Sequence, residues 1–351
     1  MGWRVRPFLV VAVGALGCDA VPEVSLGDGP PDAWAGSFDD GAADAASDAV
    51  PGAGDAWIEA AAAVVVESSD GTMTDVCVSA LDPACVPFGA PVFVQELSSG
   101  TGNGYDEDPT LTSDMLEIYF LSTREGGPGH GDVWKSVRDS GDASWNPPTL
   151  VQYVSSPDRE TCPAVTLDGL SLYVASDRDG GKGGYDIWMT SRASRAYDWP
   201  PPTPVSELNT PNDEIPRPLG DHSLAMPLSY RISQSYEYQI YMATRSSPSA
   251  MWTAPALLAW VDTANLDVDG FLSDDALSFA FSSDRLNDAG IQDLFLALRA
   301  DPFSAFVTAE ALASVNLATS GEAHPWLSPD QRELYFDSDR SGVPRIYHAT
   351  R

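Results

Sequence analysis

The chain has 351 residues, of which 43% are hydrophobic, and this is enough for one large domain or two ordinary ones with a buried core. It carries 51 acidic and 19 basic residues, so its formal net charge is −32. A charge of this sign and size argues against nucleic acid as a partner and against electrostatic docking on anionic lipid.

The N-terminal segment has the features of an export signal. Two arginines precede an apolar run over 8–16 that is too short to span a bilayer as a mature helix. The following ALGC resembles the end of a bacterial lipoprotein signal, although Ala15 and Leu16 depart from its usual residues. We expect a signal peptide over 1–17 and a lipidated Cys18 that anchors the protein to the membrane by lipid alone. Ordinary secretion and an uncleaved anchor are the alternatives.

An acidic segment of low complexity follows over 18–76. It consists mostly of Ala, Asp, Gly, Pro and Ser, contains no Lys or Arg, and cannot bury enough apolar surface to offset its ordering entropy. We predict a disordered tether. Beyond it, Cys77 and Cys85 lie eight residues apart around a proline, and in an exported protein we expect them to form a local disulfide. Cys162 is then left over, and we expect a buried free thiol there.

The remaining segment, 77–351, contains a repeat. Five marker residues lie 54, 53, 54 and 55 positions apart: Pro109, Pro163, Pro216, Gly270 and Pro325. An acid stands three residues before every marker, and an aspartate, a serine and an arginine stand five, thirteen and fifteen residues after it. Agreement at all five markers indicates a repeat protein. The acids and arginines are Asp106, Glu160, Asp213, Asp267, Glu322, Arg124, Arg178, Arg231, Arg285 and Arg340.

Each unit predicts four short strands separated by Gly- and Pro-rich turns, which is typical of a β-propeller blade. The chain ends just after the third strand of the fifth unit, and the segment FGAPVFVQEL from Phe88 matches WNPPTLVQYV from Trp145. We therefore predict an all-β, five-bladed propeller of four-stranded blades. The N-terminal strand completes the last blade, so that the ring closes without an open edge.

The units PAVTLDGLSLYVASDRDGGKGGYDIW and PWLSPDQRELYFDSDR resemble the WD40-like PD40 repeats of the TolB propeller type. The resemblance covers about 86–351 and is specific for the fold. It implies a periplasmic or surface-exposed binding scaffold of the bacterial cell envelope, often a lipoprotein. TolB itself has six blades and an extra N-terminal domain, whereas this chain has five predicted blades and a tether. The binding partner of TolB is therefore not assigned to this chain.

The acids before the markers and the arginines are expected to share one face, around the mouth of the central channel. In a four-stranded blade, the start of the first strand and the loop after the second strand lie at the same end. One hypothesis is that each acid pairs with an arginine or caps backbone N–H groups and so ties blade to blade. The alternative is a ring of carboxylates that binds calcium, which takes six to eight oxygen ligands. No other cofactor is expected.

The loop SDRDGGKGGYDIW, over 176–188, is rich in glycine and aspartate. It runs into a strand rather than a helix, which argues against a phosphate-binding loop, and it lacks the closing Glu of an EF-hand. A hairpin with glycines at positive φ is the favoured interpretation, with calcium as the alternative. Lys182 occurs in this unit alone, so it is a candidate for a ligand face, as are Tyr236 and Tyr238 of the divergent third unit and His324 near the channel mouth.

No catalytic constellation is visible in the sequence. The four histidines form no HxxxH or HxH spacing, and there is no GxSxG. We predict a monomeric, non-catalytic protein that binds an envelope protein or a polysaccharide on the channel face. The alternative is a carbohydrate-active enzyme, a glycosidase or a lyase, with its site in the channel; a glycosidase would need two carboxylates there that break the fivefold pattern.

Overall fold

The computed structural model describes most of the chain beyond residue 85. The described residues are 64–65, 76–77, 86–100, 104–231, 238–286 and 290–351. The signal peptide and most of the tether lie outside these ranges, as do Cys18, Cys85 and Tyr236. The lipidation, the local disulfide and the ligand role of Tyr236 therefore remain predictions.

Two isolated strands, β1 (Val64–Val65) and β2 (Val76–Cys77), form an antiparallel pair in a unit separate from the rest of the chain. β1 falls within the segment predicted as a tether. In the described part of the chain, no helix is both long and apolar enough to cross a membrane.

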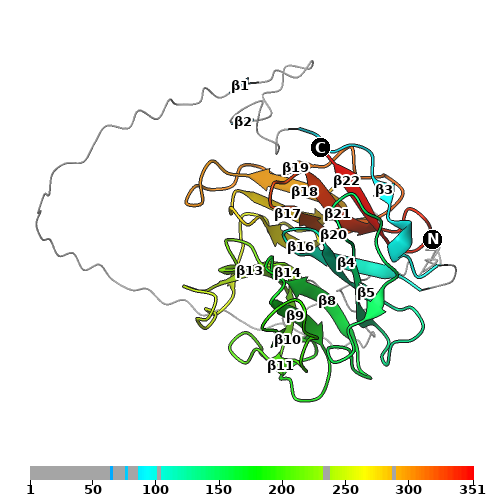
Figure 1. Cartoon of the computed structure of the whole chain (residues 1–351). Coiled ribbons are helices and arrows are strands. Elements are labelled where there is room, and N and C mark those ends of the chain that lie inside the picture. Colours follow the sequence, from blue (N-terminus) through cyan, green and yellow to red (C-terminus); the bar gives the residue numbers. More distant parts are fainter. Residues whose placement is uncertain (1–63, 66–75, 78–85, 101–103, 232–237, 287–289) are drawn as a thin grey trace, which may run out of the picture. The chain divides into compact units, whose positions relative to one another are not determined.

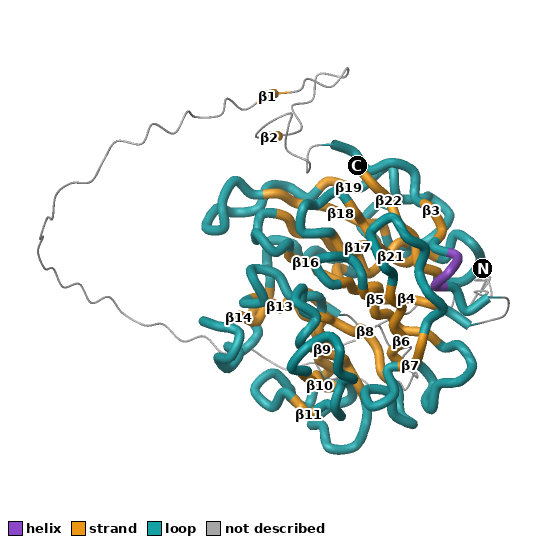
Figure 2. Tube along the Cα trace, in the orientation of Figure 1, coloured by secondary structure: helices purple, strands orange, loops and turns teal. Residues whose placement is uncertain are grey.

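Five four-stranded antiparallel sheets follow one another around an axis (Figures 1 and 2), and they confirm the predicted five-bladed propeller. The first strands are β4 (Asp106–Leu111), β8 (Glu160–Val165), β12 (Asp213–Pro216), β16 (Asp267–Leu272) and β20 (Glu322–Leu327). The second strands are β5 (Glu117–Ser122), β9 (Ser171–Ser176), β13 (Ala225–Arg231), β17 (Ser278–Ser283) and β21 (Glu333–Ser338). The third strands are β6 (Asp132–Val137), β10 (Asp186–Ser191), β14 (Gln239–Thr244), β18 (Asp293–Leu298) and β22 (Arg345–Thr350).

The outer strands are short, and one of them closes the ring. Four blades end with β7 (Thr149–Leu150), β11 (Thr203–Pro204), β15 (Ala256–Leu257) and β19 (Glu310–Ala311). In the fifth blade, β3 (Val92–Phe93) takes this place and pairs with β22, as predicted. Figure 1 shows the cyan β3 beside the red β22, and a single 3-10 turn, η2 (Gln95–Leu97), leads from β3 toward the first blade.

The marker prolines lie in the first strands, which form the inner edges of the sheets. Proline has no N–H to donate, and it is tolerated on an edge strand, where no further strand pairs. In four blades the pairing with the second strand shifts register just before the marker, which is a β-bulge. The bulged residues have positive φ although none is glycine: Asp108 (56°), Cys162 (48°), Asp269 (59°) and His324 (53°).

A second set of arginines explains why each outer strand is preceded by an aromatic residue. An arginine just beyond the third strand places its guanidinium 4.2–4.5 Å from the centre of that ring, a favourable cation–π arrangement. Its Nε also donates to a backbone carbonyl at the first turn of the same blade. The pairs are Arg138–Trp145, Arg192–Trp199, Arg245–Trp252, Arg299–Phe306 and Arg351–Phe88.

Candidate functional site

The structure pairs every acid of the predicted ring with the arginine of its own blade. The pairs are Asp106–Arg124 (2.7 Å), Glu160–Arg178 (2.7 Å), Glu322–Arg340 (2.9 Å), Asp213–Arg231 and Asp267–Arg285. In the second blade, Arg178 also donates to the carbonyl of Val154, which arrives from the first blade, at 2.6 Å. Each carboxylate already has a cationic partner, and this favours the ion-pair hypothesis over the calcium ring.

The glycine-rich loop is held by its own aspartate. The Asp186 carboxylate accepts the N–H groups of Lys182 (2.8 Å) and Gly183 (3.0 Å), as a hairpin requires. Lys182 itself donates its Nζ to the carbonyls of Ser206 (2.8 Å) and Asn209 (3.0 Å), so its charge ties this loop to the chain beyond β11.

Tyr238 does not lie on a ligand-accessible face, so this prediction is wrong. The side chain is buried, and the Arg231 guanidinium lies 5.0 Å from its ring centre. Its hydroxyl points to Asp213, at 3.3 Å from the carboxylate. Tyr238 therefore belongs to the ring of ion pairs.

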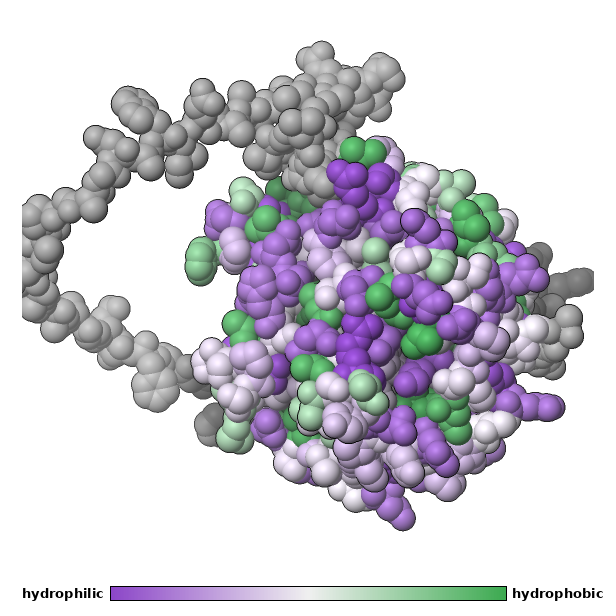
Figure 3. Space-filling model, in the orientation of Figure 1, coloured by the Kyte–Doolittle hydropathy of each residue, from purple (hydrophilic) through white to green (hydrophobic). Residues whose placement is uncertain are grey.

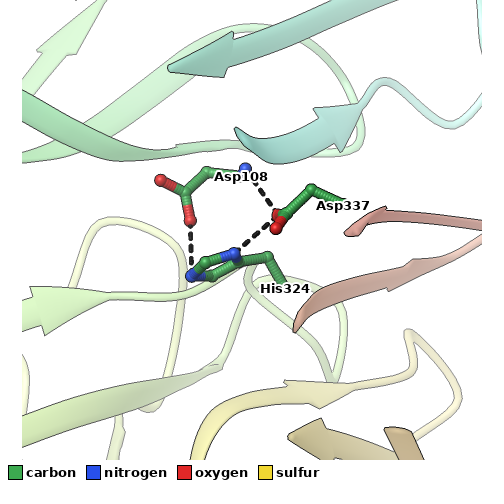
Figure 4. Close-up of side chains that lie close together, drawn as sticks. All are labelled: Asp108, His324 and Asp337. Carbon is green, nitrogen blue, oxygen red and sulfur yellow. Dashed lines mark hydrogen bonds and ion pairs between the residues drawn. The ribbon is translucent and has the colours of Figure 1, made fainter. Parts of the chain in front are cut away.

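His324 lies in the channel, where the bulge of β20 directs it against two carboxylates (Figure 4). Its Nδ1 is 2.6 Å from Asp337 and its Nε2 is 2.9 Å from Asp108. The backbone N–H of Asp108 also donates to Asp337, at 3.1 Å. All three side chains are buried, and they come from the first and fifth blades.

Arg217 and Asp269 extend this cluster toward the third and fourth blades. Arg217 forms an ion pair with Asp269, and its Nη1 lies 3.3 Å from Asp108. His324 Nε2 lies 3.4 Å from Asp269 as well. Five buried charged side chains thus form one network, the channel network: Asp108, Arg217, Asp269, His324 and Asp337.

The network sets the charge state of its members. Burial alone would lower the pKa of the His324 imidazole, but attraction to Asp108 and Asp337 outweighs it and raises the pKa to about 10. Burial would raise the pKa of the Asp108 carboxyl, yet His324 and Arg217 hold it below its usual value. Nearby Glu107 is different: burial, with repulsion from Asp337 and Asp108, raises its pKa well above the ordinary range. We therefore assign a positive charge to His324 at neutral pH.

The space enclosed by the network is small. Prolines of four blades line it together with Asp108, Arg217, Asp269 and His324, and it has room for about one water molecule. Cys162 lines the same space and is buried as expected, but it takes part in a disulfide, so the prediction of a free thiol is wrong. That prediction failed because it assigned all other cysteines to the lipid and the local disulfide. Since Cys18, Cys77 and Cys85 are the only other cysteines, an intrachain disulfide at Cys162 excludes that lipidation of Cys18 and a Cys77–Cys85 disulfide both hold.

Glu214 is a buried acid outside this network that offers a test of pH dependence. It accepts hydrogen bonds from the backbone N–H (3.0 Å) and hydroxyl of Thr210, but burial dominates and raises its pKa to about 7. Because the pKa of Glu214 is raised in the folded protein, the stability that its protonated carboxyl contributes is complete below pH 4.5, the ordinary pKa of a glutamate. This stability is lost as the pH rises through 7.

Replacement of Glu214 by glutamine is therefore expected to stabilise the protein at pH 8 by about 1–3 kcal/mol and to change little at pH 4.5. Urea denaturation at both pH values measures this, with the exposed Glu207→Gln as control. Equal pH profiles for Glu214→Gln and the parent protein would refute the assignment.

A larger cavity, the blade 3–4 pocket, lies between the third and fourth blades. Its volume is about 360 Å³, and its lining includes Asp221, Leu258, Trp260, Phe279, Arg299 and Phe306. Asp221 lies in the first turn of the third blade, and Leu258 and Trp260 lie just beyond its outer strand. In the fourth blade, Phe279 lies in β17, Arg299 just beyond β18, and Phe306 before β19. Figure 3 shows one face of the propeller, where hydrophilic residues surround separate apolar patches. The pocket was not predicted from the sequence.

No protein-family model and no curated protein matches this sequence. Solved structures do match. TolB from Acinetobacter baumannii is 12% identical with a TM-score of 0.42, over 72% of this chain and 56% of that chain. An endo-arabinase from Bacteroides thetaiotaomicron is 15% identical with a TM-score of 0.47, over 75% and 97%. An α-L-arabinofuranosidase from Lactobacillus brevis is 13% identical with a TM-score of 0.46, over 74% and 94%. TolB and glycosidases both occur among these matches, and likeness at this level concerns the fold alone.

Proposed function

We propose that this chain is a non-catalytic binding protein of the bacterial cell envelope, which takes a protein or a polysaccharide as ligand. One observation carries the proposal: the channel carboxylates that break the fivefold pattern are bound to His324 and Arg217 and enclose room for about one water molecule. A glycosidase needs two carboxylates about 5–10 Å apart with the scissile bond between them. The channel network has the carboxylates without the space.

The competing function is hydrolysis in the channel, since acids stand there at positions that do not follow the repeat, namely Asp108, Asp269 and Asp337. The test incubates the purified propeller with neutral polysaccharides and measures binding and the release of reducing ends in the same samples. We expect binding without release. Release that disappears in Asp108→Asn would overturn the proposal; asparagine tolerates the positive φ of residue 108, so the variant keeps the backbone.

Attachment to the envelope is the second part of the proposal and is supported by the apolar run and the ALGC sequence before residue 19. Expression of the full chain in a bacterial host, with mass spectrometry of the N-terminal peptide, tests it. We expect acylated Cys18 in the membrane fraction and release into the soluble fraction by Cys18→Ser. An intact N-terminus or an unmodified cysteine would contradict lipid anchoring.

A further inference from the structure

The blade 3–4 pocket has the size and the lining of a small-molecule site. Its volume of about 360 Å³ falls in the range of ligand pockets, which combine a mostly apolar lining with a few oriented polar groups. The neighbouring blade interfaces are filled differently. Between the first and second blades, for example, Trp199 donates its Nε1 to the hydroxyl of Tyr119 at 3.1 Å. The third blade has Pro227 at the position of Tyr119, since Pro227 pairs with Met242 as Tyr119 pairs with Lys135, and the fourth blade has Phe306 at the position of Trp199. Neither side chain can form this bond.

Trp260 supplies a flat apolar surface in this pocket. Its indole stacks on Phe306, with ring centres 4.8 Å apart and an interplanar angle of 19°, and meets Phe279 edge-on at 5.4 Å. Yet 42% of Trp260 stays exposed. The two phenylalanines fix the ring, and its remaining surface is open to a ligand.

Asp221 offers a carboxylate that the fold does not use. In the other four blades the aspartate of the first turn accepts a hydrogen bond from a hydroxyl two residues earlier, at 2.5–2.7 Å. The third blade has Leu219 there, and within the described residues no hydrogen bond reaches the Asp221 carboxylate. Its turn also differs, since Asp221, His222 and Ser223 have φ of 49°, 54° and 64°. Three such non-glycine residues in a row are costly, and conformations of this kind cluster at functional sites.

Arg299 offers donors on the same pocket. Its Nε is committed to the carbonyl of Ala276 at 2.6 Å, and its guanidinium lies over Phe306 at 4.5 Å. Its two terminal amino groups have no hydrogen-bond partner in the part of the chain that the structure describes. The pocket therefore presents an acceptor, two donor groups and an aromatic surface.

From these groups we infer that the blade 3–4 pocket binds a neutral sugar ring. This inference rests on the proposed binding function and favours a polysaccharide over a protein as the ligand. Sugar hydroxyls both donate and accept, so they satisfy Asp221 and Arg299 together, while the C–H face of the ring covers Trp260. A cationic ligand would be repelled by Arg299, and an anionic one by Asp221 and by the net charge of −32. A neutral, hydroxylated ring meets neither penalty.

Isothermal titration calorimetry of the full chain tests this with maltotriose, cellotriose, mannotriose and arabinotriose as neutral probes. Trigalacturonate and trilysine serve as charged probes. We expect at least one neutral trisaccharide to bind, and Trp260→Ala to weaken it roughly tenfold, as loss of an anchoring aromatic does. Asp221→Asn, which suits the positive φ, is expected to weaken it as well. The matched control is Tyr153→Ala, because Tyr153 holds the same repeat position in the first blade and is 54% exposed.

Three results would overturn the inference: no binding of any neutral probe, binding of a charged probe alone, or equal affinity in the parent, Trp260→Ala and Asp221→Asn proteins. Circular dichroism shows whether Trp260→Ala folds, and Trp260→Phe replaces it if it does not. Cleavage of a bound probe would instead contradict the proposed non-catalytic function. If a trisaccharide binds equally well to the parent, Trp260→Ala and Asp221→Asn proteins, the proposed binding function is still supported, but the blade 3–4 pocket is not its site.

Discussion

Replacement of Arg217 by methionine is expected to lower the free energy of unfolding by about 3–5 kcal/mol, the usual cost of leaving a buried charge without its partner. Arg217 is buried and forms ion pairs with Asp269 and Asp108. Methionine keeps most of the apolar stem but removes the charge. The three carboxylates of the channel network, Asp108, Asp269 and Asp337, would then have His324 as the only cation of that network.

Urea denaturation at pH 7 measures this effect. Arg332→Met, at an exposed site, is the matched control and is expected to change stability by less than about 0.5 kcal/mol. The double variant Arg217→Met with Asp269→Asn is expected to recover much of the loss, since it removes the unpaired charge as well. A loss in the double variant equal to the sum of the two single losses would show that the charges do not interact.

Replacement of His324 by asparagine is expected to cost about 3–5 kcal/mol at pH 7 and to alter the pH dependence of stability. The imidazole pKa is about 10 in the folded protein against an ordinary value of 6.5. A raised histidine pKa contributes stability that is complete below pH 6.5 and is lost as the pH rises through 10. The parent protein should therefore lose stability between pH 7 and 10, and His324→Asn should lose much less.

Denaturation at pH 7, 8.5 and 10 on both proteins tests this. Glu107, whose raised pKa also makes stability fall with pH, is present in both proteins, but its pKa is lowered by His324, so the difference between them reports on His324 together with its effect on Glu107. Asparagine accepts the positive φ of this position, so backbone strain is not introduced. Parallel pH profiles would mean that His324 is neutral in the folded state.

The fold could be predicted because the same sequence pattern occurs in five successive units, one for each blade. Arg178, for example, forms an ion pair with the acid of its own blade, as the corresponding arginine does in every other blade. Residues that recur for such a reason can be recognised in the sequence without a structure. The closing strand was predictable too, since the segment at Phe88 copies the outer-strand pattern of the other units.

The channel network was not predictable in the same way, apart from His324. Its members occupy positions at which the units differ: the residue before the marker is Asp108, Cys162, Ile215, Asp269 or His324. A search for recurring residues discards such positions. The available signal was a charged residue inside a strand that is otherwise apolar, as for Asp337 in ELYFDS, because buried strands rarely hold an unpaired charge.

The pairing of β3 with β22 determines when this protein can finish folding. Val92 pairs with His348, so residues 256 positions apart must meet (348 − 92 = 256) before the fifth blade is complete. Contacts between residues so far apart in the sequence form late, because closing the long intervening loop costs conformational entropy before the contact itself stabilises the fold. If the chain is exported from its N-terminus, β3 arrives first and its partner last. β3 then has no partner until translocation has ended, and during that interval a chaperone or a protease can act on it.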